Sequence, residues 1–219
     1  RVAFRRLVRQ ARADAPAAAV FIDNPGFNLR LAKKLHRQGI PVVYYICPQV
    51  WAWGKRRIPA IVETVDRLLT IFPFEPEVFA GTGLDARFVG HPLVSRLRDC
   101  RETALRRDPN TVLLLPGSRV AEIEALLPDF LGAAQVLHEH NASRQFVICV
   151  PAGRTAEIAA EQLRTHEAGH ANPAPARLVA GETLRWMQTA SAGIAASGTV
   201  TLEAAILDLP LVVAYRLNS

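Results

Sequence analysis

The sequence predicts an α/β protein built from two doubly wound parallel-sheet domains with a cleft between them. Apolar runs of strand length alternate with segments of helical period along the whole chain. The strand-length runs are apolar throughout, which is typical of parallel sheets whose two faces are both covered by helices. The alternation is interrupted once and then restarts, which divides the chain into a first domain, residues 1–98, and a second, residues 99–219.

The first domain is expected to begin with a strand at AAAVFI, residues 17–22. A helix follows over residues 27–38, and Gly39 closes it because glycine readily adopts the left-handed conformation that ends helices. Three further apolar runs predict the remaining strands: VVYYIC at 42–47, RLLTIF at 67–72 and ARFVG at 86–90.

The turn at His91-Pro92 and a charged stretch at residues 95–110 predict the connection between the domains. The second domain then repeats the alternation. Its expected strands are 111–115, 144–150, 177–180, 192–196 and 210–215. Its expected helices lie near 119–140, 155–166, 182–189 and 199–207.

The charge of the chain is concentrated in the first domain. Residues 1–98 hold 16 Lys and Arg against 7 Asp and Glu, whereas residues 99–219 hold 10 against 13. The basic blocks are consistent with solvated helix faces, and equally with a surface that meets anionic lipid headgroups or a phosphorylated substrate. No nucleic-acid motif accompanies the charge, so we expect no nucleic-acid partner.

The cysteines and the apolar stretches bear on the compartment. The three cysteines are odd in number and far apart in the sequence, which suits a reducing compartment better than a disulfide framework. No leader of charged and then apolar residues is seen, and the most apolar stretch, IPVVYYICPQVWAW, is too interrupted to span a membrane.

The stretch TVLLLPGSRVAEIE, residues 111–124, passes from a buried strand into a helix. Ligands of open α/β sheets bind outside the carboxyl ends of the strands. Gly117 lets the backbone turn tightly, Ser118 is a candidate helix cap, and the free N–H groups with the helix dipole would make an anion site. Arg119 adds a planar charged fork that suits phosphate oxygens. A purely structural turn explains this pattern equally well.

A second strand runs into a small-residue turn and then a helix within AASGTVTLEAAILDLPLVV, residues 195–213. Ser197, Gly198 and Thr199 form the turn, and Glu203 follows on the helix. A second anion-binding turn and a carboxylate that accepts ribose hydroxyls together indicate a nucleotide pocket. The alternative is a well-capped core helix with an exposed Glu203.

Asp23 ends the apolar run VFI and is followed by Asn, Pro and Gly. At the end of a strand its carboxylate should project into the cleft mouth, where it would act as a base. The alternative is an N-cap role for the helix from Phe27.

The pentapeptide HEAGH at residues 166–170 has the spacing of a zinc-protease motif, in which two histidines one turn apart bind the metal. Gly169 and the following NPAP stretch end the helix there, and no histidine follows His170. The chain also lacks the D-x-D pair that chelates a metal-bound diphosphate. We therefore expect no metal and no other cofactor.

Several motifs together resemble one family. In order they are FIDNPGFNLRLAKKL, CPQVWAW, FPFE, FVGHPL, LLLPGSR-x-x-E-I, SGTVTLEAA and PLVVAYR. They resemble the lipid-A-disaccharide synthase family, which has the GT-B architecture of two Rossmann-like domains, with the acceptor mainly on the first and the nucleotide sugar mainly on the second. The resemblance covers essentially the whole chain. The family's N-terminal strand with its Gly-rich loop and the segment after Arg216 are absent, so the resemblance implies that both domains are partial.

The resemblance implies a role for each matching residue. Asp23 becomes the general base, and Gly26 stands where many members carry a second acid, which leaves Asp23 as the only acid of the motif. The implied nucleotide-binding residues are Gly117, Ser118, Arg119, Ser197, Gly198, Thr199 and Glu203. The implied residues on the acceptor or membrane side are Asn28, Trp51, Trp53, Arg56 and His91. Core packing is an equally good explanation of the tryptophans.

The implied reaction is an inverting glycosyl transfer. It moves 2,3-diacylglucosamine from UDP to 2,3-diacylglucosamine 1-phosphate and forms the lipid A disaccharide. The implied partners are these two substrates and the lipids of the inner-membrane surface, for a cytoplasmic enzyme that is peripheral on that membrane in a Gram-negative cell; a homodimer is left open. The alternatives are another UDP-sugar enzyme of the same architecture, or a non-catalytic UDP-binding fragment.

Overall fold

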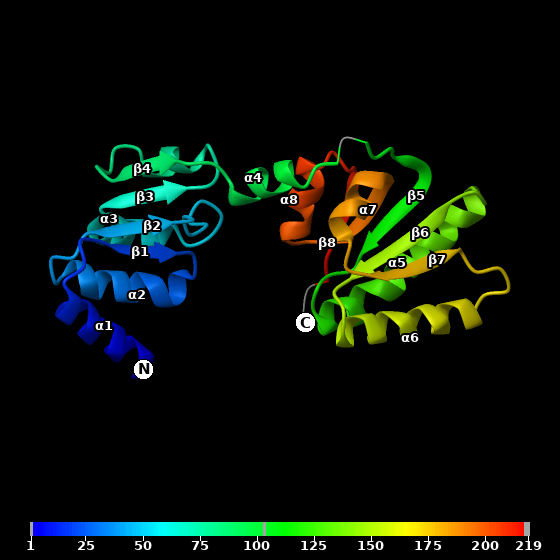
Figure 1. The fold of residues 1–219 in the computed structure, drawn as a ribbon, viewed down its shortest axis with the longest axis horizontal. Helices are drawn as coiled ribbons and strands as arrows, with labels where there is room; N and C mark the ends of the chain where they lie inside the picture. Colours follow the sequence, from blue (N-terminus) through cyan, green and yellow to red (C-terminus); the bar gives the residue numbers. More distant parts are fainter. Residues whose placement is uncertain (1, 103, 217–219) are drawn as a thin grey trace. The chain divides into compact units, whose positions relative to one another are not determined.

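The structure is a computed structural model that describes residues 2–102 and 104–216 (Figure 1). It consists of two compact units, of which the first ends at Pro92 and the second begins at Leu93. The sequence placed the division at 98/99, inside the helix α4 (Pro92–Asp99). The structure divides earlier because Leu97 of α4 is fully buried in a core of the second unit. Each unit is a parallel-sheet α/β fold, as predicted.

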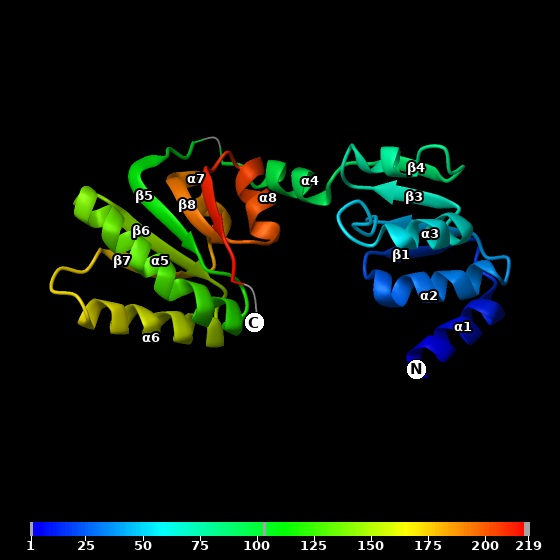
Figure 2. The same ribbon diagram turned by 180° about the vertical axis from the view of Figure 1, so that it is seen from behind.

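The first unit contains a parallel sheet in the order β1-β2-β3-β4. Its strands are β1 (Ala19–Ile22), β2 (Val42–Tyr45), β3 (Arg67–Thr70) and β4 (Asp85–Phe88). Its helical elements are α1 (Val2–Asp14), α2 (Pro25–His36), η1 (Lys55–Arg57), α3 (Ile58–Thr64) and η2 (Glu75–Phe79). The four predicted strands and the helix after β1 are confirmed. The sequence analysis missed α1 and α3; α1 lies beside α2 in both views (Figure 1, Figure 2).

The core of the first unit lies on one face of its sheet. Side chains at alternate positions, such as Phe21 and Tyr44, meet Leu31 and Leu35 of α2 and Ile61 of α3. The opposite face carries Val20 and Ile22, which are 64% and 59% exposed. The expected cover on both faces is therefore not found for the described part of this unit.

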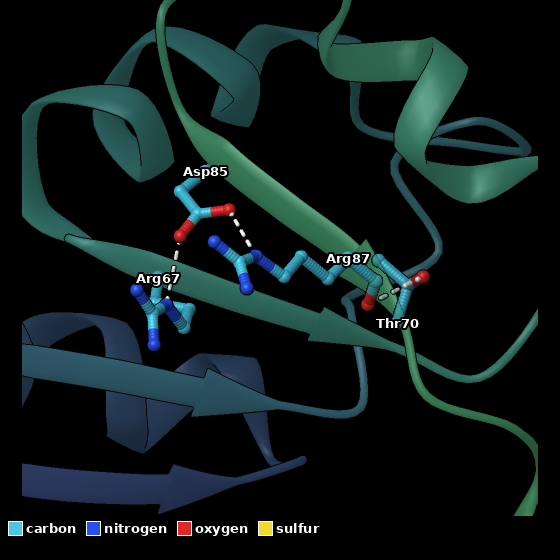
Figure 3. A network of polar contacts seen from close by, with 4 residues as sticks. All are labelled: Arg67, Thr70, Asp85 and Arg87. Atoms are coloured by element: carbon cyan, nitrogen blue, oxygen red, sulfur yellow. Dashed lines mark hydrogen bonds and ion pairs between the residues drawn. The ribbon is translucent and has the colours of Figure 1, made fainter.

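The same opposite face carries an ion-pair network near β3 and β4. Asp85 accepts hydrogen bonds from Nε of Arg87 and Nε of Arg67, at 2.7 and 2.8 Å (Figure 3). The hydrogen bond from Arg87 is the main cause that holds the pKa of the Asp85 carboxyl below its ordinary value. The backbone carbonyl of Arg87 also accepts the Thr70 hydroxyl, at 3.3 Å. The network ties the edge strand β4 to its neighbour β3, on a face that has no apolar cover among the described residues.

The second unit contains a parallel sheet in the order β7-β6-β5-β8-β9. Its strands are β5 (Asp108–Leu115), β6 (Gln145–Val150), β7 (Ala176–Ala180), β8 (Ala190–Ala196) and β9 (Leu211–Ala214). The helices α5 (Val120–His140), α6 (Arg154–Ala168), α7 (Thr183–Thr189) and α8 (Thr199–Ile206) alternate with them. Every strand and helix predicted for this domain is confirmed.

Helices cover both faces of the second sheet (Figure 1). Leu114 and Ile148 point toward α5 and α6, whereas Leu113 and Cys149 point into the cluster with α7 and α8. The chain runs outward from β5 to β7 in one direction and then returns to place β8 on the other side of β5. This reversal is the topological switch point, at which open α/β sheets bind ligands.

Candidate active site

A cavity of about 460 Å³ opens in the second unit at the carboxyl ends of β5 and β8, which is the switch point. Both predicted turns line it. The lining includes all the residues predicted to bind a nucleotide: Gly117, Ser118, Arg119, Ser197, Gly198, Thr199 and Glu203. Two turns that are about eighty residues apart in the sequence thus meet at one hollow, because β5 and β8 are neighbours in the sheet.

The side chain of Glu122 is hydrogen-bonded to the first turn. Its Oε2 accepts hydrogen bonds from the N–H groups of Ser118, at 3.0 Å, and Arg119, at 3.2 Å. Its Oε1 pairs with the guanidinium of Arg119. The predictions that Ser118 caps the helix and that the N–H groups of the turn are free are therefore wrong: the N-cap residue is Arg119 in a capping box with Glu122.

The close fit of Glu122 requires Gly117. Gly117 has φ 121°, in the left-handed region that glycine tolerates, and a Cβ at this position would lie 2.5 Å from Oε2 of Glu122. Partial burial raises the pKa of the Glu122 carboxyl. The hydrogen bonds from Arg119 and from the two N–H groups outweigh burial, so that this pKa lies below its ordinary value. Glu122 is therefore an anion that sits among the donors of the turn.

The second turn leads into α8, whose N-cap is Gly198. The hydroxyl of Thr201 donates to the Gly198 carbonyl, at 2.8 Å. Glu203, one turn further on, keeps only 17% of its side chain exposed, and its Oε1 lies 3.9 Å from Nη2 of Arg96. The alternative of an exposed Glu203 is therefore wrong, because the side chain is largely buried in the wall of the cavity.

Arg96 and the residues after β6 and β7 also line the cavity, and the sequence analysis missed them. Arg96 was missed because residues 95–110 were interpreted as a charged connection between the domains. The others, such as Pro151 and Thr183, follow the carboxyl ends of two more parallel strands, and this position is the signal that would have found them. Cys149 lines the cavity as a neutral thiol, because burial and then the charge of Glu182 raise its pKa to about 12.

Asp23 lies directly after β1 in the first unit and has a positive φ of 47°. Its carbonyl accepts the Tyr44 hydroxyl at 2.7 Å and the Asn28 side-chain amide at 2.8 Å, and its N–H donates to the Tyr45 carbonyl at 3.0 Å. Its side chain is exposed and makes no hydrogen bond or ion pair with any residue that the structure describes. The backbone is thus fixed at three points while the carboxylate stays available.

The capping alternative for Asp23 is wrong. The helix α2 begins at Pro25, and its N-cap residue is Asn24, which makes no side-chain capping bond. Asn28 was predicted on the acceptor side, but its amide donates to the carbonyls of Ile22 and Asp23, at 3.0 and 2.8 Å. The structure therefore gives Asn28 a local task, which is to hold the Asp23 turn.

Two of the residues predicted for the acceptor side, Trp51 and His91, belong to one aromatic cluster at the carboxyl ends of the first sheet. The ring of Trp51 meets Phe74 edge-on at 5.1 Å, Phe74 stacks on Phe72 at 5.7 Å, and Phe72 contacts the His91 ring at 5.5 Å. Trp53 is 71% exposed, and Arg56, three residues further along the chain, is exposed in η1. Core packing therefore does not explain Trp53, whereas Trp51 is packed on one side.

Glu75 anchors this cluster, and the sequence analysis did not single it out. Its side chain is buried, and Oε2 accepts the N–H groups of Ile71 and Phe72 at 3.0 and 2.9 Å. Oε1 accepts the indole N–H of Trp51 at 3.3 Å. The sequence signal for this role was the acid that follows Phe74 in the turn FPFE, because carboxylates readily accept hydrogen bonds from the N–H groups of a turn.

Only the first histidine of the HEAGH motif lies in a helix, although the rings of His166 and His170 lie 4.2 Å apart. The helix α6 ends at Ala168 with Gly169 as its C-cap, and Nδ1 of His170 lies 2.8 Å from the His166 carbonyl. Residues 2–102 and 104–216 contain no group of three or more His, Cys, Asp or Glu placed to hold a metal ion. Within the same residues, none of the helices has the length and apolarity needed to cross a membrane.

Comparison with solved structures shows where this fold occurs. The chain resembles a co-structure of S. aureus MnaA with UDP (TM-score 0.63, 9% identity, 96% of this chain and 60% of that chain). It also resembles the UDP-GlcNAc 2-epimerase from Methanocaldococcus jannaschii (TM-score 0.62, 13% identity, 96% of this chain and 64% of that chain). At such identities the likeness shows the fold alone, which is the Rossmann-like pair of GT-B enzymes.

Comparison at the sequence level is more specific. The lipid-A-disaccharide synthase of Syntrophus aciditrophicus (strain SB) is 41% identical over 221 residues, and that of Anaeromyxobacter sp. (strain K) is 42% identical over 220. Each alignment covers 98% of this chain but 56% of the relative, so the chain spans little more than half of their length. The family model described as lipid-A-disaccharide synthetase matches residues 2–219. The chain therefore belongs to the lipid-A-disaccharide synthase family.

Proposed function

We propose that this chain supplies the nucleotide-sugar site and part of the acceptor site of a lipid-A-disaccharide synthase. The observation that carries the proposal is the meeting of two strand–turn–helix N-termini at the cavity of the second unit. Helix N-termini and an arginine fork attract a diphosphate, and Glu203 in the cavity wall is an acceptor for ribose hydroxyls. Family membership supplies the reaction class, since relatives that match the chain are named as this synthase.

The proposed reaction is transfer of 2,3-diacylglucosamine from UDP to the 6-hydroxyl of 2,3-diacylglucosamine 1-phosphate with inversion at the anomeric carbon. An inverting transfer needs a base that removes the proton from the attacking hydroxyl. Asp23 suits this role because its carboxylate is exposed and unpaired among the described residues, while its backbone is fixed by Tyr44 and Asn28.

Departure of UDP needs stabilisation of the charge that develops on its diphosphate. We assign this task to the N-termini of α5 and α8 and to Arg119, with no metal ion. The sequence supports this assignment because the chain contains no D-x-D pair. Arg96, which lines the same cavity, adds a second cation there.

The acceptor is proposed to bind at the carboxyl edge of the first sheet, from the surface of the cytoplasmic membrane. This edge carries Asp23 and the aromatic cluster of Trp51, and the exposed Trp53 is followed by three consecutive basic residues. Exposed indoles beside basic residues favour the interface of an anionic bilayer. A peripheral position on the inner face of that membrane follows from the proposal.

A transfer assay on the full-length protein tests the function. We expect turnover with UDP-2,3-diacylglucosamine and 2,3-diacylglucosamine 1-phosphate, and none with UDP-GlcNAc as donor. Turnover with UDP-GlcNAc alone would identify another UDP-sugar enzyme, which is a real alternative because that fold is shared with UDP-GlcNAc 2-epimerases. UDP binding without turnover on either donor would identify a binding protein.

A further inference from the structure

The donors that should receive a diphosphate already have an anionic partner. The N–H groups of Ser118 and Arg119 both donate to Oε2 of Glu122, and the Arg119 guanidinium pairs with Oε1. The two oxygens of one carboxylate therefore engage two backbone donors and a charged fork, as two oxygens of a phosphate group would.

Because Glu122 lies in the wall of the cavity, its contacts with the turn affect ligand binding as well as helix capping. Glu122 lines the same cavity as Arg119 and keeps 31% of its side chain exposed. A second arginine and carboxylate of the same cavity form a longer ion pair, in which Nη2 of Arg96 lies 3.9 Å from Oε1 of Glu203. The charges of the two arginines in the cavity are thus balanced by two carboxylates, and a diphosphate that enters adds negative charge beside Glu122.

We propose that Glu122 competes with the nucleotide diphosphate for Arg119 and the two turn N–H groups, so that binding requires these donors to change partner. The inference rests on the proposed function, because it assumes that the diphosphate lies at this turn. The exchange is feasible since Arg119 is 79% exposed and its side chain is free to swing from Glu122 toward the cavity. Glu122 thereby weakens the affinity for nucleotide and keeps UDP from being held too firmly after transfer.

The direction of the effect separates competition from a purely structural role. If Glu122 only shaped the turn, its removal would weaken UDP binding. If it competes, removal of its charge should strengthen binding. Release of hydrogen bonds to a charged group corresponds to a change of roughly tenfold or more in Kd.

The test is calorimetric titration of UDP into the full-length protein and its Glu122→Gln variant. Glutamine keeps the size of the side chain and a carbonyl acceptor for the turn N–H groups, but it loses the charge that holds Arg119. We expect the Kd for UDP to fall about tenfold. The matched control is Glu124→Gln, which removes the same charge from an exposed position of α5 that does not line the cavity, and it should leave the Kd unchanged.

The outcomes distinguish the two proposals. If the unchanged protein binds UDP and Glu122→Gln binds it equally or more weakly, Glu122 only stabilises the turn. The inference is then overturned, while the proposed function stands. If neither protein binds UDP, the diphosphate site itself is refuted and the inference falls with it. Thermal unfolding of both variants establishes that any change in Kd does not come from loss of the fold.

Discussion

At the residue scale, the site depends on side chains whose backbones are fixed and whose functional atoms stay accessible. The Asp23 backbone is held by Tyr44, Tyr45 and Asn28, and its carboxylate is exposed. Burial, and then the charge of Asp23, raise the pKa of Tyr44, so its hydroxyl remains a donor to the Asp23 carbonyl at physiological pH.

We expect Asp23→Asn to lower the rate of glycosyl transfer by about a hundredfold to ten-thousandfold, the usual contribution of a general base. The Kd for UDP should not change, because Asp23 belongs to the first unit and the UDP cavity to the second. Steady-state kinetics and calorimetry on the full-length protein measure the two effects. Asp14→Asn, an exposed acid of the same unit, is the control, and near-normal turnover of Asp23→Asn would refute the role of the base.

The sequence could predict the residues that the two turns bring to the cavity, but not the rest of its lining or how the side chains pair. Strand ends, glycines and helix starts are visible in one dimension, and all the residues predicted to bind a nucleotide were brought together. The hydrogen bonds that Glu122 accepts from the turn depend on its side-chain conformation, which the sequence does not show. For the same reason the sequence analysis chose Ser118 as the N-cap residue, whereas it is Arg119. Asn28 was likewise placed by motif, whereas its hydrogen bonds are set by the left-handed turn at Asp23.

At the element scale, a partly buried arginine fixes the ends of two helices. Arg107 donates from Nη1 to the carbonyls of Met187 and Ala190, at 2.9 and 2.5 Å, and from Nη2 to that of Leu207, at 2.5 Å. It thereby stabilises the carboxyl ends of α7 and α8 in the second unit. The sequence analysis saw only a charged connection here, because the three acceptors lie 80 or more residues further along the chain.

Arg107→Ala should lower the free energy of unfolding of the second unit by about 2–3 kcal/mol, because the carbonyls of two helix ends lose a charged donor. Chemical denaturation followed by circular dichroism measures this loss. Arg106→Ala, the exposed neighbour, should change stability by less than about 0.5 kcal/mol. Equal stability of the two variants would show that Arg107 does not hold these helix ends.

Glu75→Gln should loosen the aromatic cluster of the first unit and lower the free energy of unfolding by about 2 kcal/mol. The amide NH₂ group of glutamine would face the indole N–H of Trp51 or the turn N–H groups, so at least one buried donor loses its acceptor. Glu77→Gln, at an exposed position of the same η2, is the control. Denaturation and tryptophan fluorescence follow the change, and unchanged values for Glu75→Gln would contradict the anchoring role.

At the scale of the whole molecule, the two tandem α/β units and their parallel strands follow from the alternation of strand and helix patterns. At this scale the structure differs from the prediction in the cover of the first sheet and in the position of the division between the units. Apolar residues such as Val20 and Ile22 predict a buried face, but both side chains are exposed. The prediction failed because the apolar pattern alone carries no information on which segment would cover this face. The chain spans 56% of the length of the two relatives described above.

Removal of divalent metal should leave transfer unaffected. The diphosphate is proposed to be stabilised by Arg119 and helix N-termini, and the chain has no D-x-D pair to chelate a metal. We expect equal transfer rates in buffer with EDTA and with added Mg²⁺. A rate that collapses in EDTA and returns with Mg²⁺ would contradict this part of the mechanism.

The central claim is that the cavity at the β5–β8 switch point holds the nucleotide diphosphate. The most direct measurement is an experimental structure of the full-length protein in complex with UDP. We predict the diphosphate between the turns at 117–119 and 197–199, within hydrogen-bond distance (about 2.7–2.9 Å) of the Arg119 guanidinium, with Glu122 displaced from it. A diphosphate bound elsewhere, with Arg119 still paired to Glu122, would contradict the account.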